Sequence, residues 1–477
     1  MRVYDTLTRT EREFEPVRPG VAGMYVCGMT VQDKPHIGHF LPFLAADVIR
    51  RYLEHKGYRI THVQNFTDVD DKIIERARRE GTTPAAVAER NIHKYYEAAQ
   101  AMNLLPATFY PRATEHIPEI IALIETLLDK RHAYAAANGD VYFRVRSFPN
   151  YGTLSGRKID DLMSGARVEV GDEKEDPLDF ALWKAAKPGE PQWPSPWGAG
   201  RPGWHIECSA MSMKYLGETF DMHGGGRDLL FPHHENELAQ SEAATGRPFV
   251  RFWMHNGLLY TGGQKMSKSL GNFATMEELL QRFAADELRL FVLSTHFRSQ
   301  AEYSEERLLE ARAAFQRLRE AFLRLQEARA TSGESTVLVS EAGSELRDAS
   351  SRLQQEFHQS MEQDFNTAAA LGKVFELVRL ANRFLDGVAP GRDRAVLEAV
   401  QVALAAMLQL LGFFPDGTPR PETESVAIPA QVTALARQRL EARRGRDWGR
   451  ADALRQEILA HGYVVEDHAD GYRLKRR

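Results

Sequence analysis

The sequence predicts an α/β fold with a parallel sheet of the doubly wound type, followed by a region of helices. Residues 21–27 predict a short apolar strand, residues 37–56 a helix that Gly57 ends, and residues 58–64 a second strand. This order of strand, helix and strand is typical of a parallel sheet, because the helix returns the chain to the starting edge. From Ser304 onward, apolar residues recur at three- and four-residue steps, which indicates amphipathic helices.

The α/β pattern continues after the second strand. Residues 68–80 predict a helix that Gly81 stops, and the next helix begins with Thr83 as its N-cap and Pro84 in its first turn. Residues 106–203 include a run rich in Pro, Gly and Trp, which predicts loop structure. We therefore expect this segment to be an insertion, after which the α/β domain resumes.

The later part of the chain predicts a helix bundle and a small, separate end. A stretch rich in Pro, Thr and Glu at residues 414–429 indicates a linker. Residues 437–477 carry 11 Arg and Lys against 7 Asp and Glu, although the whole chain has a net charge of -5. We expect three domains, over residues 1–300 with an insertion at about 106–203, residues 301–415 and residues 430–477.

Composition limits the class of protein. The chain is 43% hydrophobic and 27% charged, as ordinary soluble domains are. It has only two cysteines, which excludes a disulfide framework and favours the reducing cytoplasm. The N-terminus lacks the apolar segment of a signal peptide, and no run of about 18 apolar residues occurs, so we expect no contact with a membrane.

A first candidate for phosphate binding is His36-Ile-Gly-His39, at the start of the first predicted helix. A helix N-terminus presents free N–H groups and the positive end of the helix dipole, which suit a phosphate. The two histidines can point their donors the same way, and Gly38 leaves room for a base or ribose to approach the backbone. Taken alone, the motif has an equal alternative, which is a structural pair of histidines.

A second candidate is Lys265-Met-Ser-Lys268-Ser, which follows a Gly-rich turn. Two lysines in such a loop can hold a polyphosphate whose charge is being redistributed. The alternative is an ordinary solvated surface loop.

A metal site is a third candidate. Cys27 ends the first predicted strand, Cys208 lies far downstream, and His233 and Glu237 are four residues apart, so they share one face if they lie on a helix. Together they are a sulfur, nitrogen and oxygen set that zinc accepts. Apolar packing of the cysteines and a polar helix start are the alternatives, because no close pair of cysteines marks a metal site here.

The two phosphate motifs together resemble the paired signature of class I aminoacyl-tRNA synthetases. The resemblance implies a Rossmann-like catalytic core. It implies that His36, Gly38 and His39 form part of the ATP site and that the histidines bind phosphates. It further implies that Lys265 and Lys268 stabilise the departing pyrophosphate, with Mg²⁺ accompanying ATP.

Longer segments resemble cysteinyl-tRNA synthetases in particular. They are MYVCGMTVQDKPHIGH (24–39), GWHIECSAM (203–211), GGGRDLLFPHHENE (224–237) and KMSKSLGN (265–272). This family implies that Cys27, Cys208, His233 and Glu237 hold one Zn²⁺ per chain, which the thiolate of the substrate L-cysteine joins. Four further positions match motif residues near the amino acid of the family: Thr67, Trp204, His223 and Asp228, the last facing the ammonium. The family usually has Pro and Tyr where this chain has Met29 and Gln32.

A metal explains how such an enzyme separates cysteine from serine, which differ by one atom. A shaped pocket discriminates such a difference by only about 10–200-fold. Zinc binds a thiolate well and favours its deprotonation, whereas a hydroxyl competes poorly.

The C-terminal segment bears on the acceptor. Residues 446–455 resemble the small α+β anticodon-binding domain of the synthetase, in which Trp448 can stack on a base. The implied partners are tRNA(Cys), ATP and L-cysteine, and the family is mostly monomeric. A cysteine:amino-sugar ligase of the mycothiol-pathway type shares the motifs but resembles a synthetase shortened at its C-terminus. A non-catalytic RNA-binding paralogue is disfavoured, because all the motif residues are present.

Overall fold

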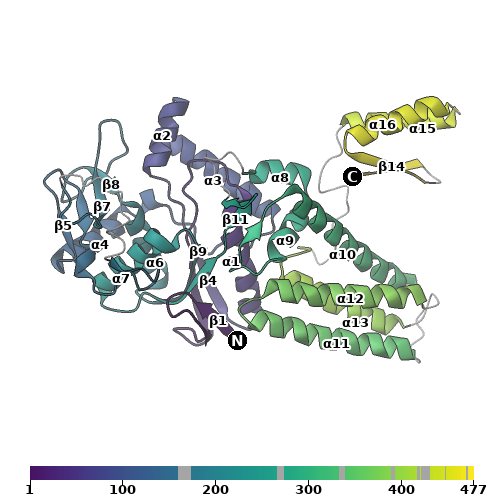
Figure 1. Ribbon diagram of the computed structural model, residues 1–477, viewed down its shortest axis with the longest axis horizontal. Helices are drawn as coiled ribbons and strands as arrows, with labels where there is room; N and C mark the ends of the chain where they lie inside the picture. Colours follow the sequence, from purple (N-terminus) through teal and green to yellow (C-terminus); the bar gives the residue numbers. More distant parts are fainter. Residues whose placement is uncertain are drawn as a thin grey trace. The chain divides into compact units, whose positions relative to one another are not determined.

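The structure is a computed structural model of the 477-residue chain, shown in Figure 1. It describes residues 1–159, 173–265, 273–331, 339–387, 393–415, 419, 430–445, 447–468 and 471–476. The chain divides into two compact units, Met1–Pro419 and Arg420–Arg477. Within the described residues, every helix is too short or too polar to span a membrane.

The centre of the first unit is a four-stranded parallel sheet. Its strands are β3 (Val21–Val26), β4 (Arg59–Gln64), β9 (Phe220–Gly226) and β10 (Val250–Asn256), in the order β10-β9-β3-β4. Each neighbouring pair is parallel, so all four carboxyl ends lie at one edge. The predicted parallel α/β sheet is confirmed, and its carboxyl edge is where such sheets bind ligands.

Helices cover both faces of this sheet, and successive side chains of one strand enter two different cores. On one face, Met24 packs in the core that includes α1 (Ile37–His55). On the other face, Tyr25 packs in the core that includes α6 (Trp204–Leu216) and α7 (Glu235–Thr245). The alternation follows from the two-residue period of a strand and explains why β3 is apolar on both sides.

Shorter elements complete the α/β part. Helices α2 (Asp71–Glu80), α3 (Pro84–Ala101), α8 (Met276–Arg282) and α9 (Ala285–Leu293) accompany two small sheets, one of β1 (Arg2–Asp5) and β2 (Thr10–Glu13) and one of β11 (Leu259–Thr261), β12 (Gln264–Lys265) and β13 (Ala301–Glu302). The π-helix η3 (Leu230–His234) runs directly into α7. As predicted, Thr83 caps α3, because its side chain accepts a hydrogen bond from the N–H of Ala86.

One predicted helix start is wrong by three residues, and one predicted helix end by one. Helix α2 begins at Asp71 rather than at residue 68, because Asp70 caps it and Asp68 binds Thr114 instead. Helix α1 ends at His55, and Gly57 follows its C-cap with φ +89. Both differences arise from side-chain and backbone contacts at helix ends, which periodicity does not report.

The predicted insertion contains a sheet of its own. Helix α4 (Ile117–Asp129) and the short helices η1 (Ala113–Glu115) and η2 (Val145–Ser147) accompany the antiparallel strands β5 (Ala133–Ala135), β6 (Val141–Phe143), β7 (Phe180–Ala185) and β8 (Gly200–Pro202). The run rich in Pro, Gly and Trp is therefore not all loop, because β8 lies within it. Strand β8 ends just before α6 and so leads the chain back to the parallel sheet.

Four long helices follow the α/β part, as predicted. They are α10 (Glu305–Thr331), α11 (Glu341–Glu362), α12 (Thr367–Gly387) and α13 (Arg394–Leu410). The predicted apolar stripes face the interior, with Leu318 and Val374 fully buried. The domain boundary predicted at residue 300 stays a prediction, since α1 and these helices share one hydrophobic core.

A buried arginine joins this bundle to the α/β part. Nη1 of Arg289 donates to Oδ2 of Asp47 at 2.8 Å and to the carbonyl of Leu411 at 2.9 Å. Its Nη2 donates to the carbonyls of Met102 and Asn103 at 2.7 and 3.0 Å. The side chain of Arg289 thus connects α1, the end of α3 and the end of α13.

The second unit is a small α+β domain. Helices α15 (Ala430–Arg444) and α16 (Trp448–Ala460) precede the antiparallel strands β14 (Tyr463–His468) and β15 (Gly471–Arg476). It has its own apolar core, which includes Ile458. The predicted α+β end domain is therefore present.

Candidate active site

Four side chains from separate segments converge at the carboxyl edge of the parallel sheet. Cys27 directly follows β3, Cys208 lies on α6, His233 lies in η3, and Glu237 lies in the first turn of α7. Their ligand atoms lie within 4.8 Å of one another, and all four side chains are buried. The structure thus brings together the four residues that were predicted to hold a metal.

The distances between these atoms suit one tetrahedral ion. Sγ of Cys27 lies 3.6 Å from Sγ of Cys208, 3.6 Å from Nε2 of His233 and 3.5 Å from Oε1 of Glu237. Zinc bonds of about 2.3 Å to sulfur and about 2.0–2.1 Å to nitrogen or oxygen place two such sulfurs about 3.8 Å apart, and sulfur about 3.5 Å from nitrogen or oxygen. Nε2 of His233 and Oε1 of Glu237 are closer, at 2.9 Å, because they form an ion pair.

Buried groups of opposite charge shift the pKa values of one another in this cluster. Burial raises the pKa of Cys208, but hydrogen bonds with Cys27 and His233 outweigh it and lower the pKa to about 6. Burial also raises the pKa of Glu237, but His223 and His233 hold it well below its usual range. Burial lowers the pKa of His233, but Glu237 and Cys208 outweigh it and raise the pKa to about 10, so the imidazole of His233 is the positive partner of two acidic groups.

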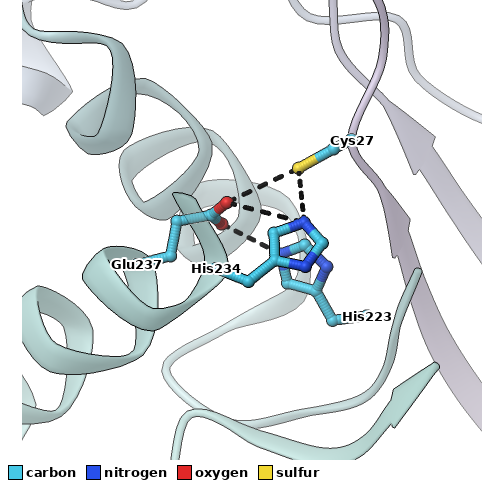
Figure 2. Close-up of side chains that lie close together, drawn as sticks. All are labelled: Cys27, His223, His234 and Glu237. Atoms are coloured by element: carbon cyan, nitrogen blue, oxygen red, sulfur yellow. Dashed lines mark hydrogen bonds and ion pairs between the residues drawn. The ribbon is translucent and has the colours of Figure 1, made fainter. Parts of the chain in front are cut away.

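A second group of four shares Cys27 and Glu237 with the first. Figure 2 shows these two with His223 and His234. Nε2 of His234 lies 3.4 Å from Sγ of Cys27 but 4.0 Å from Oε1 of Glu237, whereas Nε2 of His223 lies 2.9 Å from Oε2 of Glu237. This group has one sulfur, and its histidines approach different carboxylate oxygens. The group with both sulfurs suits zinc better.

Further side chains orient the histidines of the cluster through their second ring nitrogen. Nδ1 of His233 lies 2.9 Å from Nδ1 of His205, and Nδ1 of His234 lies 2.8 Å from Nε2 of His255, which in turn contacts Thr6. Such contacts fix the tautomer and the plane of a ring near a metal. Sequence reasoning missed these residues. His205 and His234 could have been found inside the quoted motifs, whereas nothing in the sequence marks Thr6.

Two of the residues predicted near the amino acid contact the cluster directly. The half-buried ring of Trp204 stacks on His233, with ring centroids 4.2 Å apart. His223 is fully buried and contacts Glu237, so it lies beside the predicted metal ligands. The structure therefore places both residues at the cluster. Their contact with a substrate stays a prediction.

The other two predicted residues lie in different surroundings. Thr67 is buried in the loop after β4, and its hydroxyl donates to Oε2 of Glu207 at 3.0 Å. Glu207 directly precedes Cys208 on α6, so Thr67 contacts the chain neighbour of one residue of the cluster. Asp228 lies in the exposed turn that follows β9. Glu207 was not predicted, although it stands in the motif that contains Cys208.

The first phosphate motif lies at the N-terminus of α1, as predicted. His36 is the N-cap, and the rings of His36 and His39 stack with centroids 3.6 Å apart. A Cβ atom at Gly38 would lie 3.1 Å from the ring of His36, so glycine keeps this helix start open. Met29, which departs from the family pattern, is buried in the adjacent core, while Gln32 is half-buried.

The second phosphate motif is described only at its start. Lys265 ends β12 after the expected Gly-rich turn, whereas Met266, Ser267, Lys268 and Ser269 lie outside the described residues. Beyond the motif, the N–H of Ile37 donates to the carbonyl of Ala274, and Thr275 pairs with His36. The chain that follows the second motif therefore contacts the first one.

Comparisons with known proteins identify first the class and then the family. A model of the tRNA synthetases class I (C) catalytic domain matches residues 13–313. The fold agrees, because a Mycobacterium tuberculosis methionyl-tRNA synthetase in complex with methionyl-adenylate has a TM-score of 0.65 at 16% identity, over 83% of this chain and 92% of that one. An Agrobacterium radiobacter LeuRS, in a ternary complex with tRNA and LeuAMS, has a TM-score of 0.61 at 12% identity, over 84% and 85%. The catalytic fold is that of a class I aminoacyl-tRNA synthetase.

The particular family follows from relatives matched along the whole chain. The cysteine–tRNA ligase of Nitratidesulfovibrio vulgaris is 50% identical over 99% of both chains, and that of Heliobacterium modesticaldum is 47% identical over 100% of this chain and 99% of its own. A DALR domain model matches residues 356–415, and a cysteinyl-tRNA ligase anticodon binding domain model matches residues 425–473. The chain belongs to the cysteine–tRNA ligase family.

Proposed function

We propose that this chain activates L-cysteine with ATP as cysteinyl adenylate and transfers the cysteine to the 3′ end of tRNA(Cys). One observation carries the proposal most directly. The only two cysteines of the chain meet a histidine and a glutamate at the carboxyl edge of a class I catalytic sheet, at distances that suit zinc. A borderline-soft metal at this edge accounts for selection of a thiol over a hydroxyl.

Cys27, Cys208, His233 and Glu237 are the proposed ligands of one Zn²⁺. When bound, the ion supplies a soft Lewis acid that favours the thiolate form of the substrate over the hydroxyl of serine. The chain itself positions the ligands. His205 contacts the second ring nitrogen of His233, and Trp204 stacks on the same ring, so both fix its plane.

The atoms of the substrate cysteine other than its sulfur are proposed to contact four residues predicted near the amino acid. Trp204 and His223 line the space around the side chain of the substrate, since both contact the proposed ligands. Thr67 and Asp228 bind its polar end. An amino acid has an ammonium and a carboxylate that must both be oriented before adenylation, which requires several polar contacts on one side of the metal.

ATP is proposed to bind at the start of α1. His36 and His39 face the phosphates at a helix N-terminus, and Gly38 keeps the backbone accessible. Lys265 and Lys268 stabilise the negative charge of the departing pyrophosphate, and Mg²⁺ accompanies the nucleotide. The pairing of Ile37 with Ala274 supports joint action of the two motifs, because it ties the segment after the lysines to the helix that carries the histidines.

The tRNA is proposed to be held by the helices of residues 301–415 and by the end domain of residues 430–477, outside a catalytic domain of residues 1–300. Trp448 supports this role, because its ring is 58% exposed and the guanidinium of Arg443 lies 5.8 Å from it. An exposed aromatic ring beside a cation suits a splayed base and its phosphate. The match of residues 425–473 to an anticodon binding domain favours tRNA over an amino sugar as the acceptor. We further propose a monomer that works in the cytoplasm.

The test is transfer of labelled cysteine, with ATP present, to total tRNA and in parallel to a glucosaminyl-inositol acceptor. We expect charging of tRNA and none of the amino sugar. Transfer only to the amino sugar would keep the thiol and ATP chemistry but refute the acceptor. Absence of cysteine-dependent exchange between ATP and pyrophosphate would refute the proposal as a whole.

A further inference from the structure

A turn of the inserted segment contacts the start of α7, a helix that carries a proposed metal ligand. The turn covers residues 151–157, and the side chain of Leu154 is buried in the same apolar core as Leu238 of α7. The N–H of Arg157 donates to the carbonyl of Gly152 at 2.9 Å, which closes the turn. The insertion is therefore joined to a helix of the candidate site.

Glu235, the first residue of α7, is fully buried and binds the backbone of this turn. Its Oε1 accepts a hydrogen bond from the N–H of Gly152 at 2.8 Å, and its Oε2 accepts one from the N–H of Ser155 at 2.7 Å. A backbone N–H can only donate, so the direction of both hydrogen bonds is fixed. One carboxylate thus ties two N–H groups of the turn to the start of the helix.

Two further contacts join the turn to the same part of the chain. The hydroxyl of Tyr151 donates to Oδ1 of Asn236 at 2.5 Å, and both side chains are buried. The guanidinium of Arg157 lies 4.3 Å from the ring centroid of Phe231, which belongs to η3. The turn therefore contacts residues on both sides of the proposed ligand His233.

The start of α7 depends on such contacts, because the chain bends just before it. Phe231 has extended backbone angles, φ −142 and ψ 130, inside η3. His234 is the N-cap of α7, but its side chain makes no capping hydrogen bond within the described residues. Contacts with other elements therefore decide where α7 begins relative to the parallel sheet.

The turn holds α7 from the side opposite the cluster. Side chains two residues apart in an α-helix point about 200° apart. Glu235 faces the turn, whereas Oε1 of Glu237 lies 3.5 Å from Sγ of Cys27 in the cluster. A displacement of Glu235 would move Glu237 with it, and the distance from a metal to its ligand tolerates a change of only about 0.2 Å.

We propose that the turn of residues 151–157 positions the metal ligands His233 and Glu237, and that Glu235 and Asn236 are the positioning residues through which it acts. The inference rests on the proposed function, because it requires a zinc ion at the cluster. Both positioning residues act through the helix rather than by contact with the ion. The inserted segment is in this way part of the metal centre, although none of the proposed ligands belongs to it.

The test uses two changes that loosen the contact between the turn and α7. Glu235→Gln keeps the size of the side chain but places an NH₂ group against a backbone N–H, and Tyr151→Phe removes only a hydroxyl. The matched control is Glu242→Gln. Glu242 lies near the other end of α7, away from the cluster, and also accepts from a backbone N–H, that of Phe249 at 3.1 Å.

The readouts separate positioning of the ligands from a general loss of stability. Competition with a chelator measures the affinity for zinc, and the visible absorption spectrum of the Co²⁺-loaded protein reports the geometry of its ligands. ATP–pyrophosphate exchange gives the KM for cysteine and the KM for ATP. Urea unfolding gives the stability of each variant.

We expect Glu235→Gln to weaken zinc binding by about 10- to 100-fold and Tyr151→Phe to weaken it by a smaller factor, because the first change disturbs two hydrogen bonds and the second removes one. Both should alter the Co²⁺ spectrum and raise the KM for cysteine, while the KM for ATP stays unchanged. Glu242→Gln should leave the zinc affinity, the spectrum and both KM values unchanged, whatever its effect on stability.

An unchanged spectrum and zinc affinity in both Glu235→Gln and Tyr151→Phe would overturn the inference. Equal changes in Glu242→Gln would overturn it too, because they would reflect a general loosening of α7. If Glu235→Gln does not fold, Tyr151→Phe decides alone. Failure of the unaltered protein to bind zinc or Co²⁺ would refute the metal centre of the proposed function and the inference with it, and this result is seen before any variant is compared.

Discussion

Two buried polar clusters of the first unit differ in the partners of their polar groups. In the cluster of Arg289, the guanidinium meets one carboxylate and three backbone carbonyls, and among the described residues only its Nε lacks a partner. In the cluster of Cys27, two thiols, an imidazole and a carboxylate face one another across distances that suit a shared ion. The first cluster is satisfied by the chain itself, whereas the groups of the second are also arranged as a metal ion requires.

The difference shows how a structural cluster is told from a functional one. Arg289 caps the carboxyl ends of α3 and α13, where carbonyls lack helical partners, and Asp47 balances its charge. Burial by itself therefore indicates nothing about function. Convergence of several groups that can bind one cation does indicate function.

The largest expected effect is on stability, at the satisfied cluster. Arg289→Ala leaves Asp47 paired only with Arg51 in the described part of the chain and removes the donors to the carbonyls of Met102, Asn103 and Leu411, so we expect a loss of about 3–5 kcal/mol in the free energy of unfolding. Urea unfolding followed by circular dichroism measures it. Arg307→Ala is the matched control, since the side chain of that arginine is exposed and pairs with the exposed Glu310, and it should change stability by less than about 0.5 kcal/mol. A similar small effect for both would refute the structural role of Arg289.

The next effect is on metal binding, and it decides between the two overlapping groups of four. Cys208→Ser and His233→Ala should lose the bound zinc and reduce cysteine activation at least about 100-fold, because each removes a ligand. The neighbouring His234→Ala should keep one zinc per chain with affinity weakened by about 10- to 100-fold, because His234 supports the site from outside. Zinc content by mass spectrometry and exchange kinetics measure both.

The opposite result would reassign the metal. If His234→Ala loses zinc and His233→Ala keeps it, the ion lies among Cys27, His223, His234 and Glu237. Unchanged zinc in Cys208→Ser would exclude the proposed ligand set altogether.

The smallest effect concerns a buried histidine that belongs to neither cluster. Burial lowers the pKa of His62 to about 3, and neither ring nitrogen has a hydrogen-bond partner among the described residues. As the pH decreases, His62 is protonated in the unfolded chain before it is protonated in the folded one. The free energy of unfolding is therefore highest above about pH 6.5 and decreases below it. Between pH 7 and pH 5 this histidine should cost about 2 kcal/mol.

Replacement of His62 by leucine should remove that part of the acid sensitivity, seen as a smaller shift of the urea midpoint between the two pH values. The control is His93→Leu, because His93 is 74% exposed and its loss should leave the shift unchanged. An identical shift in the His62 variant and the unaltered protein would refute the assignment.

Much of the fold was accessible from the sequence because it depends on local patterns. The strand at residues 21–27, the helix after it and the cap at Thr83 follow from apolar periodicity and turn chemistry. The start of α2 did not, because Asp68 is drawn away by Thr114, a contact from 46 residues further along the chain. Strand β8 was not predicted, because it lies in a run rich in proline and glycine and forms by pairing with β7.

The site divides in a similar way. Cys27, Cys208, His233 and Glu237 were identified by resemblance, since the residues alone favoured apolar packing of the two cysteines over a metal site. His205, His255 and Thr6 act through contacts between separate elements and carry no pattern of their own. The roles of Lys265 and Lys268 stay predictions, because the side chains of both lie outside the described residues.

The pairing of Cys27 with Cys208 also gives a simple chemical assay. These two are all the cysteines of the chain, and their sulfurs lie 3.6 Å apart. A thiol-directed dye therefore has no background sites on this polypeptide. Slow labelling that becomes rapid, with two equivalents per chain, after addition of a chelator would count the occupied centres in a preparation without any substrate.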